Sequence, residues 1–344
     1  MNRFYRLLKK VGKAVRNQMV FLILILVLLG AAIISPTFFK LTNILNVLRQ
    51  AAALGILAIG QTIVVISGGI DLSVAAVMQI AGVTLAEITK GQDALVPLAI
   101  PLCLMMGLAI GSINGFLIGM RRMQPFIATL FVGTLVTGLR LLVTRATPSG
   151  VLPPAIRVFG RGGIGPIPGA VVLLILLAIT ISFVLNKTTL GRRFYAVGSN
   201  AKAAEMSGVR VEFVTLGAFM LSGLLAAIAG IVLVGYLGYA DQAIGQGYEL
   251  DSIAAVVVGG ASLSGGKGRI SGTIAGVLLV TALLNIMLLL NLPVQYQFVV
   301  RGAVILIGVA LYSINWARSF RMIRARGGGS PKSSSKKEVD VTAA

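Results

Sequence analysis

Ten runs of apolar residues divide this chain, and each is close to the length of a segment that crosses a lipid bilayer. A helix of about 20 residues spans a hydrocarbon core of about 30 Å. The chain is 57% hydrophobic and only 12% charged, whereas a soluble domain has roughly 25% charged residues. We therefore predict an all-α polytopic membrane protein with about ten transmembrane helices. They are expected near residues 19–39, 47–67, 72–89, 95–120, 125–144, 169–186, 213–237, 250–264, 270–291 and 296–316.

Three of these runs are interrupted, and one has an alternative interpretation. Gly, Ser and acidic residues break the third and eighth runs, and the fourth contains Pro97 and Pro101. A signal peptide is the alternative for the first run, because a basic stretch precedes it. Its apolar part, 19–34, is long for a signal core, and no small-residue cleavage site follows. We expect this run to be retained as a helix.

Basic residues are concentrated between alternate runs. If the N-terminus is cytoplasmic, 22 of the 30 Lys and Arg residues fall on the cytoplasmic side, as the positive-inside rule expects. Both termini are then cytoplasmic, and the net charge of +20 does not indicate nucleic acid. We expect a basic N-terminus at 1–18, a transmembrane domain at 19–316 with a cytoplasmic loop at 187–212, and a disordered tail at 317–344 that associates with membrane lipid.

The Gly-rich stretch 259–272 resembles a phosphate-binding loop at first sight. However, Ala261 stands where the first glycine of that motif belongs, and Gly268 replaces the hydroxyl residue that binds magnesium. No strand or parallel sheet is predicted around it. We therefore interpret the stretch as a cytoplasmic turn, and we expect the chain to bind neither ATP nor a metal.

Several enzyme classes are excluded by the residue inventory. There is no histidine, so catalytic triads that use histidine and His-ligated zinc sites are impossible. Cys103 is the single cysteine, which rules out an intrachain disulfide. An intramembrane aspartyl protease needs two carboxylates within the bilayer, and Asp71, Glu87 and Asp251 all lie at predicted helix ends. Transport, channel or scaffold functions remain.

Polar side chains in apolar surroundings are the candidates for a translocation pathway, because an ionised group at the bilayer centre costs about 3 kcal/mol. Arg140 and Arg301 lie near the outer ends of their helices, so snorkelling to the membrane surface is the alternative for them. For the neutral residues the alternative is hydrogen bonding between helices. The pathway candidates are Gln61, Asp71, Ser73, Gln79, Asn114, Arg140, Asn285 and Arg301.

Two stretches differ from ordinary loops. In "SGGIDLS", Asp71 and Ser73 are placed to cap the third helix, which is the structural alternative to substrate contact. The pattern GG-x-x-LS recurs from Gly259, which suggests a duplicated unit. The second stretch, 186–213, contains a predicted short helix at 200–207, with Asn200 as its cap and Gly208 as its stop. Such a helix is suited to docking a partner, although a solvated connector is the alternative.

These segments carry a resemblance. "SGGIDLS", "GRRFYAVGSNAKAAEMSGV", "GYELDSIAAVVVGGASLSGGKG" and "GTIAGVLLVTALLNIMLLLN" occur in this order over about residues 43–313. They resemble the permease subunits of bacterial binding-protein-dependent ABC importers, in the ribose, xylose and arabinose branch. Branched-chain amino-acid permeases share the layout, but "GGIDLS" is more similar to the sugar branch.

The resemblance implies an ABC importer permease fold in the bacterial inner membrane. It implies two separate ATP-binding subunits that hold ATP and magnesium, a second permease copy, commonly identical, and a periplasmic sugar-binding protein. The binding protein would meet the outer segments 145–168 and 239–249. The resemblance also identifies the loop that couples to the ATP-binding subunit. Its candidate residues are Gly198, Asn200, Ala203, Ala204, Glu205 and Gly208.

The competing hypothesis is an ion-coupled secondary transporter of a small polar solute. Such carriers usually place acidic or histidine side chains at mid-membrane depth. This chain has no histidine, and its acidic residues near spans lie at predicted ends. A membrane scaffold is a third possibility, but it does not account for the coupling-type loop.

Overall fold

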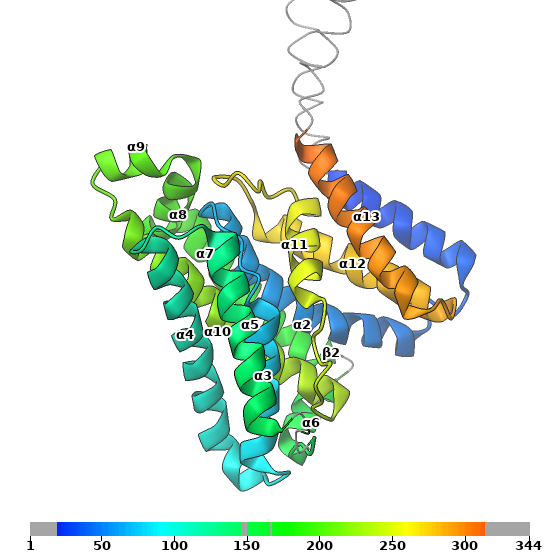
Figure 1. The fold of residues 1–344 in the computed structure, drawn as a ribbon. Coiled ribbons are helices and arrows are strands. Elements are labelled where there is room, and N and C mark those ends of the chain that lie inside the picture. Colours follow the sequence, from blue (N-terminus) through cyan, green and yellow to red (C-terminus); the bar gives the residue numbers. More distant parts are fainter. Residues whose placement is uncertain (1–18, 146, 148–149, 166, 314–344) are drawn as a thin grey trace, which may run out of the picture.

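The computed structural model describes residues 19–145, 147, 150–165 and 167–313, and this part of the chain is almost entirely helical (Figure 1). The predicted N-terminal segment 1–18 and tail 317–344 lie outside the described residues. The elements after the first helix, Met19–Ile34, are α2 (Leu41–Ile66), α3 (Val74–Thr89), η1 (Asp93–Leu95), α4 (Val96–Gly119), α5 (Pro125–Thr144), α6 (Pro154–Arg161), β1 (Gly163–Ile164), β2 (Ile167–Pro168), α7 (Gly169–Lys187), α8 (Thr189–Ser199), α9 (Ala201–Met206), α10 (Val211–Leu237), α11 (Tyr248–Val258), α12 (Ile270–Leu289) and α13 (Val294–Ser313).

Every one of the ten predicted runs contains a helix. By length and composition, α2, α4 with η1, α5, α7, α10 and α12 can cross a membrane, while Met19–Ile34 and α3 are shorter apolar helices. The eighth run was predicted too long, because α11 ends at Val258 and residues 259–264 form a loop. Pro101 lies inside the continuous helix α4, as proline does in many transmembrane helices. The polytopic all-α class is confirmed. The strands β1 and β2 have two residues each and form one small antiparallel hairpin.

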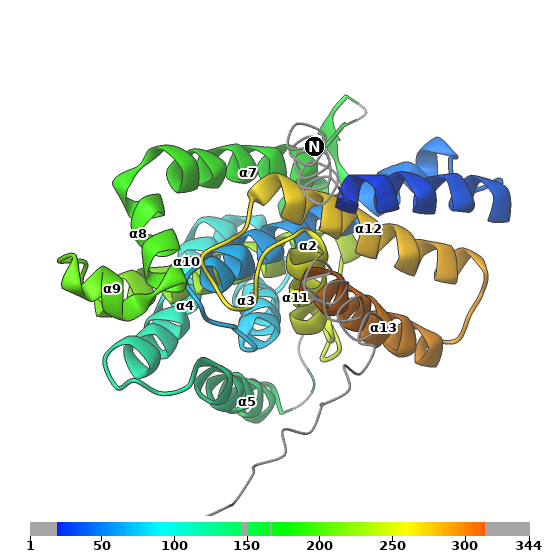
Figure 2. The same cartoon turned by 90° about the horizontal axis from the view of Figure 1, so that it is seen from above.

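Helices α2 and α10 form the centre of the molecule. All residues from Ala51 to Ile66 of α2 are buried, and α10 packs against α2, α3 and α4. By contrast, α5 and α7 lie at the periphery and expose apolar side chains such as Phe131, Ile179 and Phe183 (Figure 2). In a membrane protein these outer faces are the ones that contact lipid or another membrane subunit.

A glycine stripe explains the close packing of α4 on α10. Glycine recurs at every fourth position of α4, which places four glycines on one helix face. A Cβ atom added at Gly111 would overlap the carbonyl oxygen of Phe219, and one at Gly107 would overlap the backbone of Gly223. The two backbones therefore touch without intervening side chains. The four glycines of the stripe are Gly107, Gly111, Gly115 and Gly119.

The molecule has two ends, which we name by their helices. The α9 end contains α8, α9, the turn after α4 and the loop between α11 and α12; the α6 end contains α6 and the hairpin (Figure 1). At the α6 end, Arg161 Nε donates to the Tyr236 carbonyl oxygen at 2.9 Å. The internal basic clusters predicted to be cytoplasmic all belong to segments of the α9 end. These clusters lie at 121–122, 187–210 and 267–269.

Helices α2 and α11 end with the same backbone motif. After each, a glycine adopts a φ of 91°, Gly68 in one case and Gly260 in the other. The N–H of the next residue donates to the carbonyl five positions earlier, at 3.0 and 3.1 Å, as in a Schellman motif. Gly68 therefore corresponds to Gly260. The sequence pattern aligned Gly68 with Gly259, one residue before the glycine that shares its backbone conformation, and the duplicated unit stays a prediction.

Replacing Gly111 by leucine should open the interface between α4 and α10. The new side chain has no space against the α10 backbone, and overpacking of this kind costs about 1–3 kcal/mol or more. We expect a lower melting temperature of the detergent-purified protein and less protein in the membrane fraction. Gly217→Leu is the control, because a Cβ at Gly217 of α10 meets no atom within 4 Å. Equal melting temperatures for the two variants would contradict the packing explanation.

Candidate functional site

The side chain of Asp71 is the centre of a buried polar network. Its Oδ1 accepts hydrogen bonds from the Ser73 backbone N–H at 2.9 Å and from the Ser73 hydroxyl at 2.6 Å. Its Oδ2 accepts from the Ser222 hydroxyl of α10 at 2.8 Å. Asp71 is 1% exposed. The carboxyl group therefore joins the segment before α3 to the central helix α10, where no water is needed to satisfy it.

Neighbouring helices extend this network. Asn114 of α4 donates to the Ser73 hydroxyl at 2.7 Å, and the Leu72 N–H donates to the Thr129 hydroxyl of α5 at 3.1 Å. When the amide of Gln61 is oriented to suit both partners, it donates to the Asp71 carbonyl at 3.1 Å and accepts from the Asp71 N–H at 3.3 Å. The seven-residue connection 67–73 between α2 and α3 is thus linked to both of these helices and to α4, α5 and α10.

The cap of α3 differs in detail from the predicted one, in which Asp71 and Ser73 both cap the helix. Ser73 is the N-cap residue, but its side chain makes no capping bond and instead donates to Asp71. Asp71 lies two positions before the cap and holds the turn by accepting from Ser73. The structure brings together four of the pathway candidates, namely Gln61, Asp71, Ser73 and Asn114. Their direct partners are neighbouring helices.

The remaining neutral candidates lie elsewhere. Asn285 of α12 exchanges two amide hydrogen bonds with Asn43 of α2, at 2.9 and 3.0 Å. Gln79 is buried in α3, and its side chain makes no hydrogen bond to another residue of the described ranges. The interhelical alternative therefore describes Asn285. A role of any of these residues in the pathway stays a prediction.

Arg140 is enclosed by protein near the α6 end. Its side chain is 4% exposed, and Nη2 donates to the Gln242 carbonyl oxygen at 3.4 Å. Its Nε and Nη1 are buried without a hydrogen-bond partner in the part of the chain that the structure describes. Snorkelling to the membrane surface is not what this side chain does in the isolated chain. Two N–H donors of the Arg140 guanidinium are instead buried without an acceptor.

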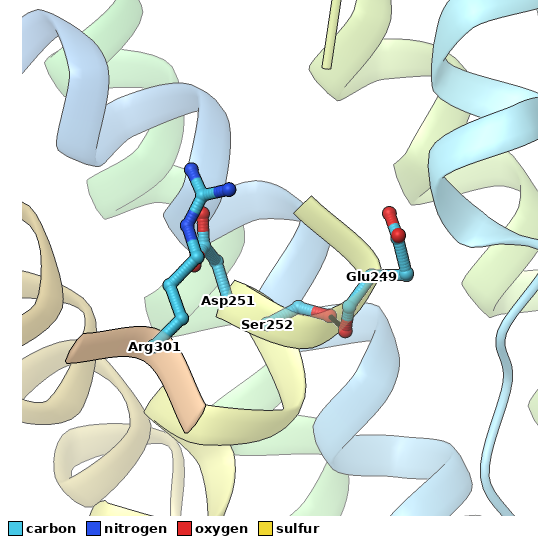
Figure 3. A network of polar contacts seen from close by, with 4 residues as sticks. All are labelled: Glu249, Asp251, Ser252 and Arg301. Carbon is cyan, nitrogen blue, oxygen red and sulfur yellow. Dashed lines mark hydrogen bonds and ion pairs between the residues drawn. The ribbon is translucent and has the colours of Figure 1, made fainter. Parts of the chain in front are cut away.

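Arg301 forms a buried ion pair that the sequence did not reveal. Its Nε lies 2.9 Å from Oδ1 of Asp251, and the two side chains are 13% and 1% exposed. Figure 3 shows Arg301 reaching from α13 to Asp251 on α11, while the carboxyl group of Glu249 points away. The guanidinium also lies 5.4 Å from the centroid of the Phe298 ring. The only clue in the sequence was that opposite charges in apolar segments tend to pair.

The connection between α7 and α10 contains the predicted short helix. In α9, Asn200 Oδ1 accepts from the Ala203 N–H at 3.0 Å, and Gly208 has a φ of 80°. The Val209 N–H donates to the Ala204 carbonyl at 3.0 Å, which completes the C-terminal stop. The prediction of cap, helix and stop is confirmed. Met206 is 83% exposed on this helix.

Sequence reasoning missed the helix that supports α9. α8 begins after Thr188, whose hydroxyl accepts from the Gly191 N–H at 3.2 Å. It buries Phe194 and Val197, which are 1% and 5% exposed. The hydroxyl cap and the spacing of these two side chains by three residues were signals that a helix search could have used.

α8 is in backbone contact with two other segments. A Cβ atom at Gly198 would overlap the carbonyl oxygen of Ile66, the last residue of α2. The Gly266 N–H donates to that same oxygen at 2.8 Å. We call this contact of Ile66, Gly198 and Gly266 the α8 junction. It joins α8 to the end of α2 and to the Gly-rich loop before α12.

Tyr195 adds a side-chain link to the α8 junction. Its hydroxyl donates to the Gly268 carbonyl at 2.9 Å. Burial raises the pKa of Tyr195, and the charge of Arg269 opposes that increase. The hydroxyl therefore stays protonated at neutral pH, as a donor must be. The Gly-rich loop is held by α8 and functions as a turn in the described structure.

Comparison with known proteins identifies the family. The family described as "Branched-chain amino acid transport system / permease component" matches residues 43–309. The chain belongs to this family. It is 44% identical to the ribose import permease protein of Bacillus subtilis, over 85% of this chain and 91% of that protein. No solved structure matches the chain.

Two further relatives carry transport names. The ribose import permease protein of Escherichia coli K12 is 39% identical, over 84% of this chain and 91% of its own length. The galactofuranose transporter permease protein of the same organism is 34% identical over 88% and 91%. This chain is thus a multi-pass permease component, and its site is to be sought in the membrane-spanning helices and the loop that carries α9.

Removing the Asp71 carboxyl group should destabilise the permease. Asp71→Ala leaves the buried donors of Ser73 and Ser222 without an acceptor, and each such group costs about 1–3 kcal/mol. We expect the free energy of unfolding to fall by roughly 3 kcal/mol, seen as a lower melting temperature in detergent. Asp71→Asn should lose less, because the amide oxygen still accepts. A wild-type melting temperature for Asp71→Ala with lost uptake would instead favour substrate contact.

Proposed function

We propose that this chain is the membrane-spanning permease subunit of an ATP-driven ABC importer that takes up a simple sugar. The observation that carries the proposal is 44% identity to a ribose import permease over 91% of that protein. The galactofuranose permease named among the relatives supports a sugar as the class of solute. The chain does not hydrolyse ATP in this proposal, because the Gly-rich loop lacks both the first glycine and the hydroxyl of a phosphate-binding motif.

The partner of α9 is proposed to be a separate ATP-binding subunit. The helix projects from the body of the molecule (Figure 1). It exposes the apolar Met206, whereas Ala204 is buried against the rest of the chain. An exposed apolar side chain on a capped helix favours docking to a protein over solvation alone. The capped ends keep the helix short and defined, so that it can move as a unit.

The α8 junction gives a path by which movement of α9 reaches the membrane helices. α8 and α9 are joined at Asn200, and Gly198 lies against the carbonyl of Ile66. Displacement of α9 would therefore press on the end of α2 and on the loop before α12. ATP binding biases the inward-open and outward-open states only if contacts differ between them. In this proposal the α8 junction is where they differ.

The α6 end, opposite to the α9 end, is proposed to receive the sugar. A periplasmic sugar-binding protein would dock on the α6 end, where α6 and the loop after α10 lie. Arg140 holds the loop after α10 through Gln242, and its two unpaired donors, which are buried in this conformation, would suit hydroxyl groups of a sugar in a state that exposes them. A second permease copy would complete the pathway, with both termini cytoplasmic in the bacterial inner membrane. An ion-coupled carrier has less support, because the named relatives are import permeases of the same family.

Reconstitution tests this function directly. Liposomes that contain the permease, its ATP-binding subunit and a sugar-loaded binding protein should take up radiolabelled sugar only when ATP is enclosed on the α9 side. Omitting any one component should reduce uptake to the level of empty liposomes. Uptake by the permease alone under a proton or sodium gradient would support the ion-coupled carrier.

Gly208 provides a test of the coupling role. Gly208→Val places a β-branched residue at a φ of 80°, which such residues rarely adopt, and should disrupt the stop of α9. We expect normal membrane insertion, with at least tenfold less ATP-binding subunit retained in a pull-down. Gly208→Asn is the matched control, because asparagine tolerates this conformation. Retention of the ATP-binding subunit by the valine variant would contradict the role of α9.

A further inference from the structure

A recess at the α9 end is lined by residues that, apart from Gly208, the coupling proposal does not use. It has a volume of about 500 Å³ and lies between the start of α8 and the start of α10. Its lining residues are Leu190, Arg193, Gly208, Arg210, Phe213 and Val214. Both α8 and α9 lie at one edge of the molecule in the two views, so the recess is at the periphery (Figures 1 and 2).

The charge of the recess is positive and uncompensated. Arg193 and Arg210 are exposed, and neither side chain forms an ion pair or a hydrogen bond with another residue in the part of the chain that the structure describes. Two guanidinium groups at one recess provide several N–H donors in the geometry that phosphate oxygens accept. An anionic group with phosphate chemistry is therefore the ligand that the polar half of the recess would recognise.

The other half of the recess is apolar and lies at the end of a membrane helix. Phe213 and Val214 belong to the first turn of α10, which is long and apolar enough to cross a membrane. Phe213 is 56% exposed and Leu190 is 40% exposed. At the boundary between membrane and water, exposed apolar side chains beside basic groups match a ligand that is charged at one end and apolar at the other.

We propose that this recess binds an anionic phospholipid, with its phosphate on Arg193 and Arg210 and its acyl chain against Leu190 and Phe213. The cytoplasmic leaflet is anionic and attracts basic groups near membrane helices. Assigning the lipid to that leaflet uses the orientation proposed above, whereas the binding itself does not. The lipid would fix the position of α8 relative to α10. Because α9 follows α8 directly, it would also fix the position of α9 relative to the membrane helices.

A soluble anion and the ATP-binding subunit are the other occupants to consider. A free phosphate group would use the two arginines but leave Leu190 and Phe213 exposed to water. The ATP-binding subunit would cover the exposed face of α9, yet Met206 on that face does not line the recess. A lipid satisfies the arginines and the apolar side chains together.

Native mass spectrometry of the purified permease tests the proposal. The protein is stripped in neutral detergent and titrated with phosphatidylglycerol, with phosphatidylcholine as the uncharged lipid. We expect preferential binding of phosphatidylglycerol, and about thirtyfold weaker binding after Arg193→Gln with Arg210→Gln, since the two basic groups near the surface contribute about 1 kcal/mol each. Arg121→Gln with Arg122→Gln is the matched control, because it removes two arginines from the same end. The paired change to lysine should retain most of the preference.

Four results would overturn the proposal. The first is equal loss of binding in the Arg193/Arg210 and the Arg121/Arg122 variants, which would indicate a general charge effect. The second is displacement of the lipid by millimolar inorganic phosphate or by glycerophosphoglycerol, which would indicate a site for soluble anions. The third is exclusion of the lipid when the ATP-binding subunit joins the complex. The fourth is no preference for the anionic lipid in the wild type. Melting curves of all variants control for misfolding.

Discussion

The cost of burying a polar group without a hydrogen-bond partner shapes this permease, and Asp71 shows how. Its carboxyl group accepts three hydrogen bonds, two from Ser73 and one from Ser222. A carboxyl group left unpaired in such a buried position would be costly. The network ties the short connection before α3 to the central helix α10, and the surrounding helices pack around it. Burial in the protein thus makes this one polar residue a structural centre.

Close backbone contact is the second means by which the helices are held. Lipid offers no hydrophobic driving force between helices, so contact between backbones and small residues replaces it. The glycine stripe of α4 against α10 does this within the membrane. The α8 junction does it at the α9 end, where Gly198 meets the carbonyl of Ile66. Because such contacts have no flexible side chain between them, a displacement on one side is passed on to the other.

The charged residues are divided between the two ends of the molecule. At the α6 end, Arg140 holds a loop through Gln242, and at the α9 end the basic residues surround a recess and a projecting helix. Between them, Arg301 and Asp251 neutralise one another inside the protein. Partners on the two sides of the membrane would therefore meet surfaces of different character. This asymmetry is compatible with a protein that receives a solute on one side and energy on the other.

The sequence by itself determined the ten helical segments, the cap and stop of α9, and the family, because these depend on local apolar length, on capping chemistry and on ordered motifs. It did not determine which polar residues meet. Asp251 and Arg301 lie 50 positions apart, and Ser222 is 151 positions from Asp71, so only the packing of helices brings them together. The same holds for the shared end of α2 and α11, which is seen in the φ of Gly68 and Gly260 rather than in matching letters. Pairings between distant segments are properties of the tertiary structure, since one apolar helix face is compatible with many neighbours.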